Sequence, residues 1–122
     1  MATHHQPKDL GDLLLVQVSP GWTKDNITLL GGHVYTLGQV LAKVDHKHQP
    51  LDPAGKAPAN KAVAVLAEPI DATGGDKPAV VIARGAVLAL AELTWPAGIT
   101  AEQKAQALDQ LNAHGIVARA TL

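Results

Sequence analysis

The chain has 122 residues, with ten Lys and Arg against eleven Asp and Glu, so its formal charge is −1. This balance disfavours electrostatic binding to nucleic acid, which needs clustered basic side chains. The absence of Cys excludes disulfides, thiol nucleophiles and cysteine-ligated metal centres. From the length we expect one compact domain. No apolar run approaches the roughly 20 residues of a membrane-spanning helix, and no signal-peptide pattern opens the chain. We therefore expect synthesis in the cytoplasm and no membrane partner, and from the charge balance no nucleic-acid partner.

The apolar residues are mostly small. The sequence holds 21 Ala, 16 Leu, 11 Val and 5 Ile, but its aromatic residues are Trp22, Tyr35 and Trp95 alone. An Ala buries little area, and the free energy gained on burial is about 25 cal/mol per Å². This composition favours a domain that closes part of its apolar surface against other subunits.

The N-terminal part of the chain contains one candidate strand. Residues 1–12 are polar and read as a flexible terminus. Residues 13–18 are apolar except for one Gln, and Ser19, Pro20 and Gly21 end the run. A short β-prone segment in this place is either an edge strand of its own domain or an arm that pairs with another chain. Both interpretations remain open at this point.

Further strands are expected between regular turn signals, at residues 26–30, 35–44, 62–67, 79–84, 86–93 and 116–119. Residues 86–93 are apolar on both faces, which is typical of a strand covered on both sides. The cover is either the rest of the fold or another subunit.

One helix is expected late in the chain. Thr100 is a good N-cap, Gln103 stands at the N3 position of a capping box, and Gly115 is placed for a left-handed stop. The spacing of the apolar residues predicts a narrow buried stripe on a helix that covers the sheet. The stripe is Ala101, Ala105, Leu108 and Leu111.

A metal site is the first chemical hypothesis to weigh. Residues 45–61 contain three prolines and read as a long exposed loop. The pattern predicts His46 and His48 on the same side of an extended segment, and with the carboxylate of Asp45 they could hold Zn²⁺ or Ni²⁺. No third ligand is specified, so a solvated loop is the simpler interpretation. A small β-domain that binds a ligand or metal through residues 45–61 is therefore the alternative function.

The sequence shows no catalytic constellation. Ser19 is the only serine, and no Gly-x-Ser-x-Gly elbow surrounds it. Residues 73–76 resemble a phosphate-binding loop, but Lys77 is followed by Pro78 instead of Ser or Thr at the start of a helix. We therefore expect no enzymatic activity, no cofactor and no resident metal.

Three large residues are candidate contacts. Trp95, followed by Pro96, lies between an apolar strand and the helix start, where the indole either fills the core or anchors a subunit contact. Trp22 lies next to the N-terminal segment and is expected to fasten its root to the body. All three are candidates for arm-root or trimer contacts.

Several sequence segments, in a fixed order along the chain, resemble one known family. They are residues 25–32 (DNITLLGG), 37–44 (LGQVLAKV), 71–81 (DATGGDKPAVV) and 93–100 (LTWPAGIT), followed by the Ala-rich helix and residues 115–117. Over roughly residues 20–119 the chain is similar to the head decoration protein D family of tailed bacteriophages, which includes the decoration protein of phage lambda.

The resemblance implies a fold and a function. The implied fold class is mainly β with one short α-helix (α+β), a small β-barrel or β-tulip-like domain with an extended N-terminal arm. The implied function is that of a homotrimeric cementing protein, seated at threefold and quasi-threefold sites on the exterior of the expanded virion capsid. It would stabilise the head against the pressure of packaged DNA, without catalysis.

The resemblance also divides the chain. Residues 1–21 would form a flexible arm and residues 22–122 the decoration domain. In the family, the arm adds a strand to the major capsid protein, and by position this role falls on about residues 13–18. The implied capsid-binding residues are Leu13, Leu14, Leu15, Val16 and Val18. The chain departs from the lambda protein in its arm and in residues 45–61.

Overall fold

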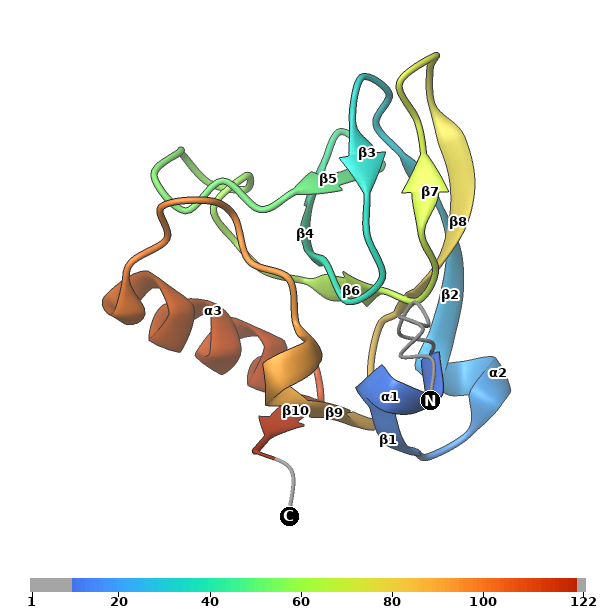
Figure 1. Ribbon diagram of the computed structural model, residues 1–122, viewed down its shortest axis with the longest axis vertical. Coiled ribbons are helices and arrows are strands. Elements are labelled where there is room, and N and C mark those ends of the chain that lie inside the picture. The colour runs from blue at the N-terminus through green and yellow to red at the C-terminus, as the bar shows by residue number, and fades with distance from the viewer. Residues whose placement is uncertain (1–9, 121–122) are drawn as a thin grey trace, which may run out of the picture.

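The computed structural model describes residues 10–120 and is mainly β with a single longer helix, which confirms the α+β class (Figure 1). The elements in chain order are α1 (Leu10–Leu13), β1 (Leu14–Gln17), α2 (Pro20–Thr23), β2 (Lys24–Leu29), β3 (Val34–Tyr35), β4 (Val40–Val44), β5 (Lys47–Pro50), β6 (Ala64–Leu66), β7 (Ile70–Asp71), β8 (Lys77–Ile82), β9 (Ala86–Ala89), the 3-10 helix η1 (Leu90–Glu92), α3 (Ala101–Ala113) and β10 (Ile116–Arg119).

Five strands pair in the order β2-β5-β4-β6-β8 and close into a ring. Strand β2 runs antiparallel to β8 along all six of its residues. It meets β5 through one registered parallel pair, Leu29 with His48, and the Leu30 amide donates to the His48 carbonyl over 2.8 Å. The β2–β5 seam is therefore the narrowest pairing of the ring.

A second sheet has the order β1-β9-β10, with β9 antiparallel to β1 and parallel to β10. Figure 1 shows this sheet and α3 at the opposite end of the molecule from the β3 and β7 pair. The N-terminal strand β1 and the C-terminal strand β10 thus flank β9 on its two edges. Segments from the two ends of the chain share one small sheet.

The core has two parts. One lies among β2, β4, β6 and β8 and includes Leu29, Leu41 and Val81 with Tyr35 of β3. The Tyr35 side chain is buried, and its hydroxyl donates to the Leu30 carbonyl over 2.6 Å. Burial, and then the carboxylate of Asp76, raise the pKa of Tyr35 to about 12. The second part joins the ring to the β1-β9-β10 sheet and α3.

Helix α3 begins as the sequence predicts. The Gln103 amide donates to the Thr100 hydroxyl over 3.0 Å, and the Thr100 amide donates to the Gln103 side-chain oxygen over 3.0 Å. This reciprocal pair satisfies two helix N-terminal donors. Gly115 follows the helix at φ +79°, a conformation that costs glycine little. The chain then turns into β10.

The predicted buried stripe of α3 was wrong at its N-terminal end. Ala101 and Ala105 are exposed, whereas Ala107 and Leu111 are buried. The helix meets the core only through its second half, so the first turn projects into solvent. Spacing alone cannot show how far a helix overhangs the surface that it covers.

The loop predicted at residues 45–61 contains a strand. Asp45 and His46 have φ of +50° and +69°, which is the geometry of a two-residue hairpin turn. This turn returns β5 onto β4 in register over four pairs. Residues 90–92 differ as well, because η1 replaces the expected end of a strand and directs Leu93 into the core.

Candidate functional site

The N-terminal segment (residues 10–21) lies on the body of this chain. Strand β1 pairs with β9, and Leu13 at the end of α1 is fully buried in the core. Leu14 is half-buried. The other apolar side chains of the expected capsid-binding strand face solvent: Leu15 is 44% exposed, Val16 54% and Val18 71%.

Backbone and hydroxyl hydrogen bonds fix the root of this segment. The Val18 amide donates to the Gly85 carbonyl over 2.9 Å, and the hydroxyl of the buried Thr23 donates to the same carbonyl over 3.2 Å. The amides of Trp22 and Thr23 both donate to the Ser19 carbonyl, which closes the single turn of α2. The Gly85 carbonyl therefore holds both Val18 of the segment and Thr23 just after it.

Trp22 lies at this root and is half exposed. The Arg84 guanidinium lies 5.9 Å from the centroid of its ring and donates to its carbonyl. Two further bonds, of 3.0 and 2.7 Å, join Arg84 to the carboxylate of Asp25 and hold the pKa of that carboxyl below its usual value. A Cβ at Gly85, where φ is +60°, would lie 2.2 Å from the Trp22 ring, so only glycine fits under the indole.

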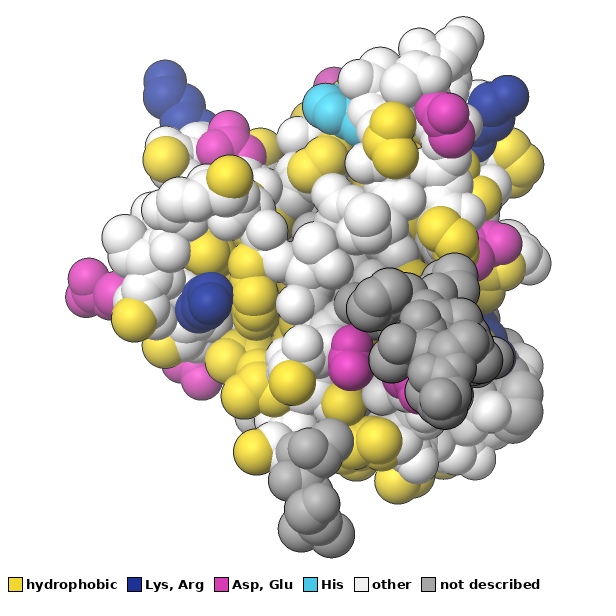
Figure 2. All heavy atoms as spheres, viewed as in Figure 1, with side chains coloured by type: hydrophobic (Ala, Val, Ile, Leu, Met, Phe, Trp, Pro, Cys, Tyr) yellow, Lys and Arg dark blue, Asp and Glu magenta, His cyan; other side chains and the backbone are white. Residues whose placement is uncertain are grey.

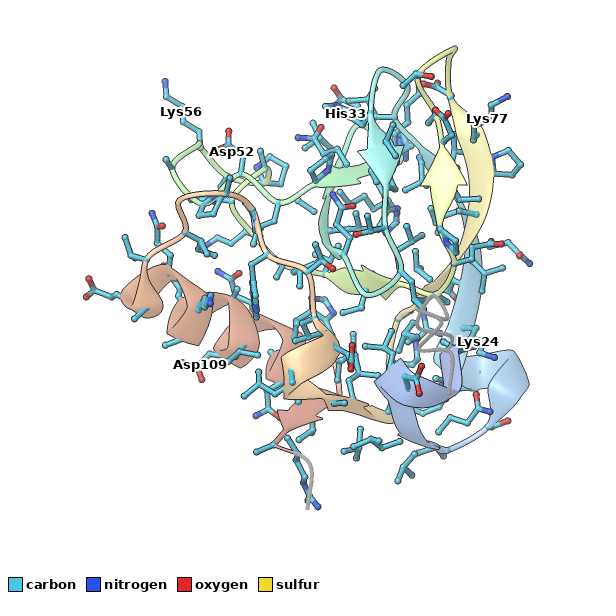
Figure 3. The ribbon with its side chains drawn as sticks, viewed as in Figure 1. Lys24, His33, Asp52, Lys56, Lys77 and Asp109 are labelled. Carbon is cyan, nitrogen blue, oxygen red and sulfur yellow. The ribbon has the colours of Figure 1, made fainter. Side chains whose placement is uncertain are left out.

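Trp95 and Pro96 belong to another part of the surface. The Trp95 ring packs against the core while the Lys104 ammonium lies 5.9 Å from its centroid. Pro96 lines a cavity of about 490 Å³ together with residues 49–54 and His33. Figure 3 shows His33 just before β3 and Asp52 in the loop after β5. This cavity is distinct from the groove that Val16 and Val18 of the N-terminal segment line.

A shallow apolar groove of about 210 Å³ crosses the outer face of the β1-β9-β10 sheet. It joins Val16 and Val18 of the N-terminal segment to Val87 of β9 and Val117 of β10. Figure 2 shows hydrophobic side chains at the end of the molecule where Figure 1 draws β9 and β10. Sequence reasoning did not identify Val87 or Val117 as site residues, although the two apolar faces of residues 86–93 pointed to a covered strand.

The structure does not bring the candidate metal ligands together. His46 is exposed in the turn, whereas His48 is only 6% exposed and its Nδ1 has no hydrogen-bond partner within the described part of the chain. Among residues 10–120, no three side chains of His, Cys, Asp or Glu are grouped to hold a metal ion. The alternative of a metal-binding loop therefore has no geometry to support it. Of residues 1–12, which were expected to be flexible, the first nine lie outside the described part of the chain, and residues 10–12 belong to α1.

His48 makes the stability of the fold sensitive to acid. Burial, and then the charge of Lys43, lower the pKa of the His48 imidazole, while Asp25 opposes them weakly. The unfolded chain therefore binds this proton more readily than the folded chain. The free energy of unfolding is expected to fall as pH drops below about 6.5, by up to about 1.4 kcal/mol per pH unit, until the folded imidazole also protonates.

Urea unfolding between pH 7.5 and 5 measures this dependence. A His48→Gln variant should lose that part of the slope, and a His114→Gln variant, altered at an exposed histidine, should keep it. Equal slopes in the wild type and His48→Gln would contradict the assignment.

The described residues also bear on membrane association. Within residues 10–120, no helix combines the length and apolar character needed to cross a bilayer. The longest, α3, has 13 residues.

Comparison with known proteins identifies the family. No curated protein matches the chain. The family model for the bacteriophage lambda head decoration protein D matches residues 3–116, which is nearly the whole of the 122-residue chain. The match includes the N-terminal segment, the ring, the β1-β9-β10 sheet as far as Ile116, and α3. The chain therefore belongs to the bacteriophage lambda head decoration protein D family.

Proposed function

We propose that the chain cements the expanded phage head from outside, as a homotrimer at threefold and quasi-threefold sites, against the pressure of packaged DNA. Membership of the head decoration family supports a capsid component whose partner is the phage capsid. The major capsid protein is the proposed direct partner, and the role is structural and not catalytic. The chain would be made in the host cytoplasm and act on the virion exterior.

One observation carries the proposal: an edge strand with exposed apolar side chains. Strand β1 ends the β1-β9-β10 sheet, so its outer edge has no strand partner within residues 10–120. An extended segment of the capsid protein can add there through main-chain hydrogen bonds, with the side chains of β1 supplying specificity. Leu15, Val16 and Val18 are exposed for this contact, while Leu13 anchors the strand to the body.

The division at residue 21 is part of the proposal. Residues 1–21 would be the attachment and residues 22–122 the decoration domain, with the capsid-binding strand at about residues 13–18. Thr23 and Trp22 at the boundary fasten the attachment to Gly85 and Arg84. Trp95 and Pro96 remain proposed trimer contacts, since both are partly exposed.

Repetition over the shell makes modest contacts sufficient. A trimer would offer three attachment strands to one capsid site, and linked contacts bind more tightly than each contact alone. Only three apolar side chains of the attachment, Leu15, Val16 and Val18, are largely exposed among the described residues, and the affinity of a single copy need not be high. The stabilisation of the head would come from the number of capsid sites that the protein occupies.

The proposal predicts the effect of charge on the exposed strand. The double variant Val16→Asp, Val18→Asp should lose at least about tenfold in affinity for expanded capsids, because a carboxylate cannot be buried in an apolar contact without a partner. Val34 on β3 is 62% exposed, so Val34→Asp is a matched control that should bind normally. Co-sedimentation measures binding, and circular dichroism checks folding. Wild-type affinity in the double variant would refute the role of β1.

A further inference from the structure

We propose that Val16, Val87 and Val117, together called the valine row, form a second part of the capsid contact, on the sheet face and not on its edge. The inference rests on the proposed function and extends it from the N-terminal segment to the decoration domain. It assigns one occupant to the row, an apolar segment of the capsid protein that also covers β1.

Strand register aligns the row. Val16 of β1 is paired with Val87 of β9, and Val87 is paired with Val117 of β10. Residues paired across neighbouring strands point to the same face of a sheet, about 5 Å apart. The flanking row of Ala86 and Ile116 is buried in the core, so the three valines face outward. They form a continuous apolar line across all three strands.

Glycines shape the groove beside the row. Gly85 and Gly115 have φ of +60° and +79° and line the groove with Val18. The Trp22 ring fills the space that a side chain at Gly85 would take, and the backbone of Gly85 lies where a side chain at Gly115 would begin. At these two positions the groove is therefore lined by backbone, with no bulky or polar side chain beside the valines.

The residues that line the groove indicate what kind of molecule can bind there. Among residues 10–120, no charged or hydrogen-bonding side chain lines the groove, which disfavours nucleic acid and ionic ligands. None of the charged residues labelled in Figure 3 lines this groove. The first nine residues of this chain, MATHHQPKD, are mostly polar and so match an apolar groove poorly. An apolar protein segment is the occupant that fits.

Continuity with β1 identifies that segment as capsid protein. Val16 and Val18 are exposed side chains of the proposed attachment and also line the groove. A capsid segment that covers them lies one strand spacing from Val87 and two from Val117, or about 5 and 10 Å. The edge contact and the face contact would thus belong to one interface.

The test separates the face from the edge. Val117→Lys and the milder Val117→Thr alter β10 and leave β1 unchanged, with Val34→Lys and Val34→Thr as matched controls on β3. Affinity for expanded capsids is measured by co-sedimentation, the oligomeric state by sedimentation velocity, and folding by circular dichroism. We expect Val117→Lys to weaken capsid binding by about tenfold and Val117→Thr by about threefold, with the controls changed by less than about twofold.

Different outcomes would overturn the valine row and the proposed cementing function. Wild-type capsid affinity in both folded Val117 variants, while Val16→Asp, Val18→Asp still loses binding, would overturn the valine row and leave the proposed function standing. A change of oligomeric state in the Val117 variants would also overturn it, since a second copy would then cover the row. Absence of binding by the wild type itself would overturn the proposed function. If Val117→Lys does not fold, Val117→Thr decides.

Discussion

Replacing Leu13 by Ala is expected to lower the free energy of unfolding by about 2–5 kcal/mol, the usual cost of emptying a buried leucine site. Leu13 is fully buried and shares its core cluster with Leu88 of β9 and Leu111 of α3. Urea unfolding followed by circular dichroism measures the effect. Leu15→Ala is the matched control, since Leu15 is 44% exposed, and it should cost less than about 1 kcal/mol.

The cost of Leu13→Ala shows whether the N-terminal segment stays on the body of the free protein. If Leu13 is anchored in solution as it is in the structure, the segment remains on the body when the protein is free, and β1 is already in place to receive a capsid strand. A loss below about 1 kcal/mol for Leu13→Ala would instead mean that the segment is detached in solution. Deletion of residues 1–18 would remove both β1 and Leu13, so it tests stability and attachment together. Point variants at Val16 and Val18 separate the two.

Gly31→Ala is expected to destabilise the fold by about 2–3 kcal/mol, at the upper end of what overpacking costs. A Cβ at Gly31 would lie 2.5 Å from the Gly75 carbonyl carbon and 2.8 Å from the Asp76 amide nitrogen. Both neighbours are backbone, so no side-chain rotation relieves the clash. The loops that follow β2 and precede β8 would have to separate.

That separation would break further contacts. The Gly31 amide donates to the Asp76 carboxylate over 2.7 Å, and the Lys47 ammonium lies 2.6 Å from the same carboxylate. Gly74→Ala, one residue from the contact, has open space around its Cβ and should change the free energy of unfolding by less than about 0.5 kcal/mol. Equal stability of the two variants in urea would show that the loops do not meet at Gly31.

The local parts of the fold could be predicted from the sequence. The start of α3 depends on Thr100 and Gln103, three residues apart, and both capping bonds form as expected. The final strand, residues 116–119, also has the predicted bounds. These features depend on interactions within a few residues of the chain, and single-sequence patterns describe such interactions well.

Features that depend on distant partners could not be predicted. Strand β5 is polar and contains Pro50, and it exists because the turn at Asp45 and His46 places it on β4. The turn lacks the Asn-Gly signature that marks such hairpins, so its strand was interpreted as loop. The burial of the individual side chains in residues 13–18 could not be predicted either. An apolar run reveals that some side chains are buried but not which ones. Leu13 is buried at the end of α1, whereas Leu15 and Val16 are exposed where the register of β1 is irregular.

Co-sedimentation of the wild-type chain with expanded and unexpanded heads of its own phage tests the central claim most directly. The proposal of a cementing protein predicts saturable binding to expanded heads, at three copies per threefold and quasi-threefold site, and little binding to unexpanded heads. It also predicts that decorated heads withstand higher temperature than bare ones. Equal binding to both forms of the head, or no binding to either, would contradict the proposal.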